Sequence, residues 1–186
     1  ILRGMPNMTI VDPCDAIDIV QATPQLAAYD GPTYMRVLRG RVPVVLDEYD
    51  YAFELGRAKV VRPGNEVLIV STGLMTERAL DAAKELAGDG IDVSVLHCPT
   101  LKPFDTETVL AEIAEDRLVL TAENHTVIGG LFGAVAEAMA TRGVTKRIHP
   151  VALPDEFLDA GALPTLYDRY GVSTAKIVER VKGLLA

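Results

Sequence analysis

Two groups of polar residues in this 186-residue chain have the types and spacing that chemistry requires. The first is Glu123-Asn124-His125, in which a carboxylate and an imidazole could serve as acid and base. These residues are predicted to lie just past the carboxyl end of a strand, the edge at which open α/β sheets bind ligands. The alternative interpretation is that they satisfy loop backbone groups or form a subunit contact, because perturbed acid–base groups mark active sites only statistically.

The second group contains Arg36 and Arg39, three residues apart on a predicted strand. In an extended chain such residues face opposite sides. Arg39 comes directly before Gly40 at the carboxyl end of the strand, where a guanidinium could bind a phosphate through two parallel hydrogen bonds. The competing interpretation is a surface ion pair with one of the many acids of the chain. The residues alone favour the ion pair.

Other kinds of chemistry do not fit the spacing. Residues 129–133 (GGLFG) lack the G-x-G-x-x-G pattern of a dinucleotide site, and Gly73 lacks the further glycines of a phosphate-binding loop. His97 and Cys98 are adjacent on a predicted strand, so they point to opposite faces and cannot pair directly as base and nucleophile. Asp105 is predicted to cap a helix. The cysteines and histidines are too scattered for a metal site.

An opening segment, residues 1–44, must position the arginines. It is predicted to contain a strand at 9–11, a helix that starts at Asp12-Pro13 and is kinked or divided at Pro24, and a strand at 33–38. The crossover between the two strands makes them parallel, and parallel strands need cover on both faces. The segment therefore needs more sheet than the chain supplies locally. We infer that it completes a larger domain upstream or docks on a partner.

The rest of the chain alternates strands with amphipathic helices. Residues 45–65 are predicted to be a linker with edge strands. The predicted strands that follow are 67–70, 91–96, 118–120 and 147–151. Ser173 is expected to cap a final helix. This alternation predicts an α/β domain with a mostly parallel sheet covered on both faces.

The composition excludes several classes of protein. Hydrophobic residues make up 49% and charged residues 24% of the chain, so it is not disordered. The net charge of −8 argues against nucleic-acid binding. No apolar run approaches the ~20 residues that cross a bilayer, and no signal peptide precedes the strand at 9–11. Cys14 and Cys98 are far apart, which favours a reduced, cytoplasmic setting without a disulfide.

Short motifs along the whole chain resemble the C-terminal part of a transketolase, a thiamine-diphosphate-dependent enzyme. In chain order these motifs are RGMPNM (3–8), VDPCD (11–15), GPTY and LR (31–39), FELGRAKVV (53–61), TLKPFD (100–105), ENH (123–125) and GGL (129–131). Each is weak alone, but their order and spacing are specific. The nearest resemblance is to split transketolases, in which the N- and C-terminal halves are separate subunits.

The resemblance implies a domain organisation. Residues 1–44 would be the last β-α-β piece of a pyrimidine-binding domain, and 45–65 a linker with edge strands. Residues 66–186 would be a three-layer α/β/α C-terminal domain with a mixed sheet that mainly supports a homodimer. By position, Arg39 matches the arginine that holds the substrate phosphate. The role of Arg36 stays open, and no catalytic role falls to His125.

The resemblance also implies an activity: transfer of a two-carbon ketol unit between sugar phosphates. The complete enzyme would use thiamine diphosphate with a divalent metal, Mg or Ca. The carboxylate that activates the aminopyrimidine and the ligands of the diphosphate and metal would lie upstream of Ile1. This chain alone is therefore expected to bind no cofactor and to be inactive, and its partner would be an N-terminal diphosphate-binding subunit or domain.

Two alternatives stay open at this point. The chain could be a non-catalytic assembly or regulatory module. It could also be the related part of a deoxyxylulose-phosphate synthase or of a 2-oxoacid dehydrogenase β subunit. An arginine aimed at a sugar phosphate argues against the dehydrogenase and less against the synthase. The sequence does not identify the sugar phosphate or distinguish a split from a single-chain enzyme.

Overall fold

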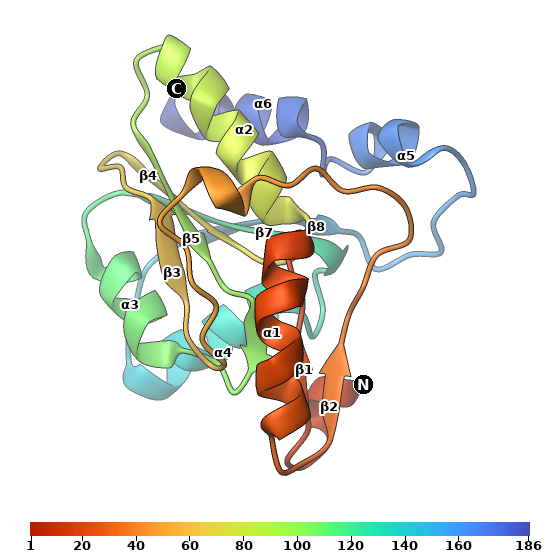
Figure 1. Ribbon diagram of the computed structural model, residues 1–186. Helices are drawn as coiled ribbons and strands as arrows, with labels where there is room; N and C mark the ends of the chain where they lie inside the picture. Colours follow the sequence, from red (N-terminus) through yellow and green to blue (C-terminus); the bar gives the residue numbers. More distant parts are fainter.

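The computed structural model describes all of residues 1–186 as two sheets with helices around them (Figure 1). The strands are β1 (Thr9–Val11), β2 (Thr33–Met35), β3 (Lys59–Arg62), β4 (Val67–Ser71), β5 (Val93–His97), β6 (Thr100–Lys102), β7 (Leu118–Thr126) and β8 (Ile148–Leu153). The helices are α1 (Ala16–Ala28), α2 (Met75–Gly88), α3 (Thr106–Ala114), α4 (Leu131–Arg142), α5 (Leu163–Arg169) and α6 (Thr174–Leu185), with 3-10 turns η1 (Leu2–Gly4) and η2 (Leu46–Glu48). None of these helices is long and apolar enough to span a membrane.

The larger sheet has the order β3-β5-β4-β7-β8. Its last four strands are mutually parallel, and β3 runs antiparallel to β5 at one edge. Helices α2 and α6 cover one face, where Leu80 and Ile177 are buried in one cluster, while α3 and α4 cover the other, where Ile113 and Val135 are buried in a second cluster (Figure 1). The predicted three-layer α/β/α arrangement with a mixed sheet is therefore confirmed.

Local signals placed several helix starts correctly. Asp105 caps α3 by accepting from the Thr108 amide, and Ser173 caps α6 by accepting from the Lys176 amide, both as predicted. Residues 67–70 of β4 are a continuous apolar run, as expected of a strand that helices cover on both faces.

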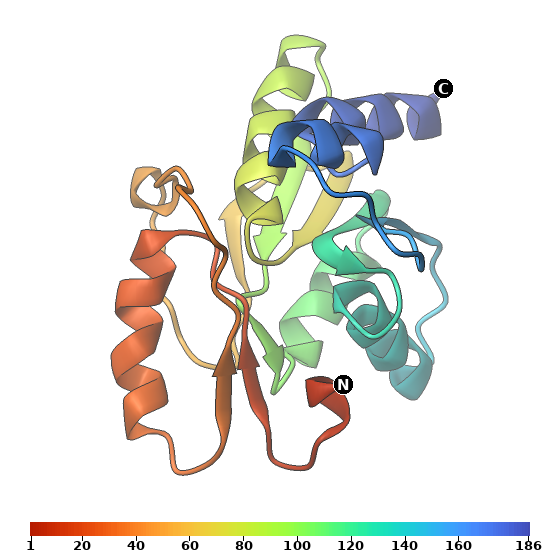
Figure 2. The ribbon, with the colours of Figure 1, turned by 90° about the vertical axis from the view of Figure 1, so that its right-hand side faces the viewer.

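The smaller sheet has the order β2-β1-β6. Strands β1 and β2 are parallel, as predicted, and α1 lies along one side of them (Figure 2). Strand β6 was not predicted. It follows β5 in the chain yet pairs antiparallel with β1 through Ile10 and Val11, so the later part of the chain contributes one strand to the sheet of the opening segment.

Helix α1 differs from its prediction at both marked positions. It begins after Asp15, whose carboxylate accepts from the Ile17 and Asp18 amides, and not at Asp12-Pro13. It also runs through Pro24 as one helix. Pro24 is exposed, so water can hydrogen-bond the carbonyl that loses its amide donor there.

Two strand ends, one expected strand and one helix also differ from the predictions. Strand β2 ends at Met35 rather than at residue 38, because β1 has only three residues and its last carbonyl accepts from the Arg36 amide. Strand β7 continues to Thr126 rather than ending at residue 120, because it keeps pairing with β8. Of the two stretches of the linker expected to be edge strands, 53–56 and 58–61, only the second contains a strand, β3, and α5 was not anticipated.

Candidate functional site

The smaller sheet meets the larger one at the carboxyl ends of β4 and β7, and we call Asp12, Arg36, Gly73, Glu123 and Asn124 the junction. Asp12 follows β1, and its carbonyl accepts from the Gly73 amide at 3.1 Å. Gly73 has a φ of +55°, and a Cβ there would lie 2.7 Å from Oδ2 of Asp12. Only glycine allows this approach, which explains an isolated Gly after β4 without any phosphate-binding loop.

Arg36 connects Asp12 and Asn124 at the junction. Its Nη1 lies 3.2 and 3.3 Å from the two carboxylate oxygens of Asp12 and 2.7 Å from Oδ1 of Asn124. Its Nη2 donates to the Asn124 carbonyl at 2.9 Å. Burial raises the pKa of Asp12, and the Arg36 guanidinium opposes that shift. Because both terminal nitrogens of Arg36 are engaged, its role is structural: it joins β2 to the end of β7.

Arg39 differs from Arg36 in every respect that matters for binding. It lies on the exposed segment after β2, not on a strand, and its side chain makes no ion pair or hydrogen bond within the chain. Residues 37–44, which we call the Arg39 loop, are held at both ends: by Arg36 before them, and after them by the Asp15 carboxylate. Oδ2 of Asp15 accepts from the amides of Val45 and Leu46 at 2.7 and 2.9 Å. The guanidinium of Arg39 is thus free on a loop with fixed ends.

A hollow of about 350 Å³ lies between the Arg39 loop and the first turns of α1. Leu38 and Val42 of the loop and Ile19 of α1 are among the residues that line it. Gly40 and Arg41 also line this hollow, whereas Arg39 does not, so the free guanidinium of Arg39 lies outside it.

The proposed acid–base pair of Glu123 and His125 is not supported by the geometry. Both residues lie within β7 and not past its end. The Glu123 carboxylate is buried and accepts from the amides of Leu131 and Phe132 at 2.7 and 2.8 Å, so it caps α4. Burial raises its pKa, and these two amides oppose the shift. His125 is exposed, 4.0 Å from the carboxylate, and its Nδ1 lies 2.8 Å from the Thr126 carbonyl. Of the two interpretations, satisfaction of backbone groups accounts for Glu123.

The two cysteines form no disulfide. Cys14 and Cys98 are both free and buried, and burial raises the pKa of each thiol well above its usual range. His97 does not pair with Cys98, as predicted from their opposite directions, and bonds instead to Asp18. No group of three or more His, Cys, Asp or Glu side chains is arranged to hold a metal ion.

Sequence reasoning missed the three carboxylates that organise the site: Asp12, Asp15 and Asp18. All three are buried, in contact respectively with Arg36, with backbone amides of the chain, and with His97. The sequence does contain a signal: Asp12, Asp15 and Asp18 place an acid at every third position of an otherwise apolar stretch. Only Asp12 received an interpretation, as the start of a helix.

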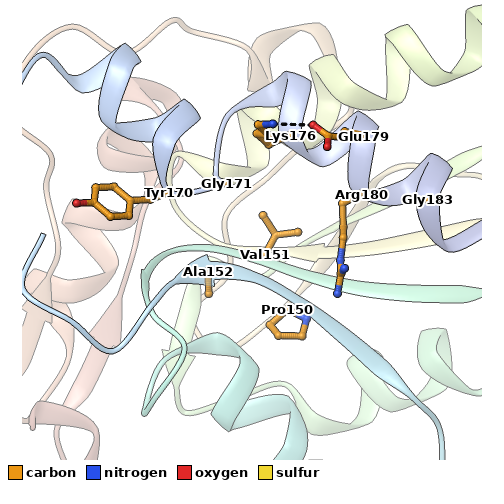
Figure 3. A pocket seen from close by; sticks show the side chains of 9 residues that line it. All are labelled: Pro150, Val151, Ala152, Tyr170, Gly171, Lys176, Glu179, Arg180 and Gly183. Atoms are coloured by element: carbon orange, nitrogen blue, oxygen red, sulfur yellow. Dashed lines mark hydrogen bonds and ion pairs between the residues drawn. The ribbon is translucent and has the colours of Figure 1, made fainter.

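A second hollow, of about 520 Å³, lies between β8 and α6 (Figure 3). It is lined by residues 150–152 and by Lys176, Glu179 and Arg180, and contains none of the residues singled out in the sequence. Lys176 is paired with Glu179 at 2.7 Å, which cancels its charge (Figure 3). Pro150 has no amide hydrogen, so this stretch of the edge strand is a poor template for another strand. Nothing in this hollow points to a ligand.

The fold belongs to the α/β class: a mixed five-stranded sheet lies in an α/β/α sandwich, with a smaller sheet at its carboxyl edge. Residues 56–177 match the family model described as "Transketolase, C-terminal domain". The chain belongs to the transketolase family, of which it contains the C-terminal domain.

Known relatives agree with this assignment. A transketolase family protein of Sinorhizobium fredii is 60% identical over 182 residues, which are 97% of this chain and 53% of that protein. A 6-deoxy-6-sulfo-D-fructose transketolase subunit of a Clostridium species is 41% identical over 96% of this chain and 55% of its own length. A 1-deoxy-D-xylulose-5-phosphate synthase of Dictyoglomus turgidum is 34% identical over 99% of this chain and 30% of its own length.

Among solved structures, a split-gene transketolase described as an inactive β4 tetramer superposes with a TM-score of 0.90 at 36% identity. The match covers 98% of this chain and 59% of that one. The chain thus spans about half the length of the first two relatives and of this structure.

Proposed function

We propose that the chain is the C-terminal part of a transketolase that transfers a two-carbon ketol unit between sugar phosphates, and that Arg39 binds the terminal phosphate of the substrate. The observation that carries the proposal is the contrast between the two arginines. Arg36 is fully engaged at the junction, whereas Arg39 is exposed and unpaired on a loop with fixed ends. A guanidinium recognises an oxyanion through two parallel hydrogen bonds.

The proposal also concerns which oxyanion Arg39 binds. The Clostridium relative is named for a sugar that carries a sulfonate, and the Dictyoglomus relative for a product that carries a phosphate. Both groups present several oxygens to a donor pair, so either would suit Arg39. We favour phosphate for this chain, with a terminal sulfonate as the second candidate.

The surface of the opening segment supports a partner. Strand β2 is an edge strand, and the outward face of α1 carries no charge because Asp18, the only ionisable residue of the helix, is buried. Val20, Tyr34 and Val37 are exposed by 71%, 40% and 59%. We propose that residues 1–44 belong to a pyrimidine-binding domain whose remainder covers this surface, that 45–65 are a linker, and that 66–186 form the C-terminal domain and support a homodimer.

We propose that the site for thiamine diphosphate is formed mainly by other parts of the complete enzyme. No cluster of possible ligands could hold its metal ion, and the amides at the start of α4, a possible anion site, are taken by Glu123. In the complete enzyme the cofactor would supply the carbanion chemistry of ketol transfer. We propose that it is held with its metal by the N-terminal diphosphate-binding subunit or domain.

The proposal is tested by Arg39→Ala in the complete, assembled enzyme. We expect the KM for phosphorylated sugars to rise by about 10- to 100-fold, because charged hydrogen bonds of roughly 1.5–3 kcal/mol are lost. Turnover of unphosphorylated analogues should be unchanged. Arg41→Ala is the matched control, because Arg41 is exposed on the same loop and also unpaired. Equal effects of Arg39→Ala on both sugar classes would refute the role, and a sulfonated sugar in the same assay distinguishes the two oxyanions.

Two other functions are tested by separate experiments, one by product analysis and one by mixing the chain with its partner. Similarity to the deoxyxylulose-phosphate synthase keeps that activity as an alternative, and product analysis with pyruvate as donor would reveal it. A non-catalytic assembly module predicts no ketol transfer when the chain is combined with its diphosphate-binding partner. Transfer that occurs only in the mixture supports the transketolase.

A further inference from the structure

A hydrogen-bond network around the buried Asp18 and His97 connects α1 to the larger sheet, and the proposed function makes no use of it. Asp18, in the first turn of α1, bonds through Oδ2 to Nε2 of His97 on β5 at 2.8 Å, and both side chains are completely buried. Tyr51 donates its hydroxyl to Oδ1 at 2.5 Å, and the Cys14 amide donates to Oδ2 at 2.8 Å. Burial alone would raise the pKa of Asp18, but His97 and these two donors outweigh it and lower that pKa.

The other side of His97 is equally well satisfied. Its Nδ1 lies 2.7 Å from Oγ1 of Thr76, which lies 2.9 Å from Oγ of Ser71, which in turn lies 3.4 Å from the Leu96 carbonyl. The hydroxyls can donate toward Nδ1 when it is bare, or away from it and onto the carbonyl when it carries a hydrogen. A buried network in which every member is satisfied fixes one orientation of its elements, here of α1 on the sheet.

The network continues to the Arg39 loop. One oxygen of the Asp15 carboxylate accepts from the Asp18 amide at 3.3 Å. The other oxygen accepts from the amides of Val45 and Leu46, which directly follow the loop. A path of contacts therefore runs from His97 on the larger sheet through the first turn of α1 to the far end of the Arg39 loop. The near end is held separately, by Arg36.

We propose that Asp18 and His97 are positioning residues for the substrate phosphate, through which the larger sheet fixes the place of the Arg39 loop. This inference rests on the proposed function of Arg39. It gives the C-terminal domain a part in substrate affinity in addition to support of a dimer.

The test compares Asp18→Ala with Asp18→Asn in the assembled enzyme. Asp18→Ala should raise the KM for a phosphorylated sugar about tenfold, with kcat and the KM of an unphosphorylated analogue unchanged within about twofold. Asp18→Asn should restore most of the affinity, because the amide oxygen can accept from Nε2 of His97 and from the Cys14 amide while the amide NH2 group donates to the Tyr51 hydroxyl. Ile113→Ala, in the core on the opposite face of the sheet, is the control for general destabilisation and should leave every KM unchanged.

A second measurement does not depend on what Arg39 binds. Hydrogen exchange of the Val45 and Leu46 amides should be faster in Asp18→Ala than in Ile113→Ala or the parent chain. Unchanged exchange, or a KM raised equally for both sugar classes, would overturn the inference. If Arg39→Ala does not distinguish the sugar classes, the proposed function fails, whereas faster exchange of the two amides would still support the anchoring role of Asp18.

Discussion

The pairing of Arg36 with Asp12 and Asn124 can be measured directly. Arg36→Met removes the guanidinium and keeps an unbranched stem, so the change is one of charge and hydrogen bonds more than of packing. The Asp12 side chain, 5% exposed, would lose its ion-pair partner, and two oxygens of Asn124 would lose their donors. The variants of a double-mutant cycle are Arg36→Met, Asp12→Asn and the combination.

The expected loss of stability in Arg36→Met follows from the contacts that Arg36 makes. Removal of one partner of a buried ion pair costs about 3–5 kcal/mol. Two observations lower this figure at the junction: the Arg36 side chain is 25% exposed, and its distances to the Asp12 carboxylate are 3.2 and 3.3 Å, longer than a strong charged hydrogen bond. We expect Arg36→Met to lower the free energy of unfolding by about 2–3 kcal/mol, and a coupling energy with Asp12 of about 1–2 kcal/mol.

Urea unfolding of the four proteins at pH 7, followed by circular dichroism and fluorescence, gives these free energies if the two probes coincide. A coupling energy below about 0.5 kcal/mol would refute the assignment of Arg36, since independent sites add within that limit. The pH supplies a control. The pKa of Asp12 is already raised, so without Arg36 the carboxyl can take up a proton as the pH falls. The cost of Arg36→Met should therefore be smaller at pH 5 than at pH 7.

Three further outcomes are expected. Gly130→Ala, at the residue before α4, should lower Tm by about 4 °C or more, because its Cβ would lie 1.8 Å from the Glu123 carboxylate that caps the helix. Gly133→Ala inside α4 should raise Tm by about 2 °C, and calorimetry that shows equal shifts would contradict this. Cys14 and Cys98 should react with a thiol reagent only after unfolding, and rapid labelling of the native chain would be inconsistent with their burial. The folded-state pKa of Asp18 lies below its unfolded value of about 3.9, so its stabilisation is present above that pH and is lost as the pH falls through the folded pKa. Asp18→Asn should thus flatten the acid side of the stability curve, and superimposable curves would count against the buried pair.

The larger sheet could be predicted from the sequence because its signals are local. Apolar runs such as 67–70 and capping residues such as Asp105 and Ser173 specify a strand or a helix start within a few residues of themselves. Alternation of such elements then defines the α/β class.

The candidate site could be predicted only in part, because its contacts connect distant residues. Asp12 looks like a helix cap in the sequence, but Arg36 engages it and Asp15 takes the capping role. Glu123 looks like a reactive acid, but the start of α4 folds back onto it eight residues later. For Arg39 the residues alone favoured an ion pair, which the structure does not contain, and its phosphate role stays a prediction.

Strand β6 has a consequence for any attempt to cut this polypeptide. Residues 100–102 lie far beyond the predicted linker, yet they complete the sheet of the opening segment. If the chain were cut at 45–65, the opening segment would lose its neighbour β6. In the other fragment β6 would lie unpaired, with exposed backbone groups. A fusion, a chimera or an exchange between related proteins should therefore keep the opening segment and β6 in the same protein, because the linker in the sequence does not separate the two sheets in space.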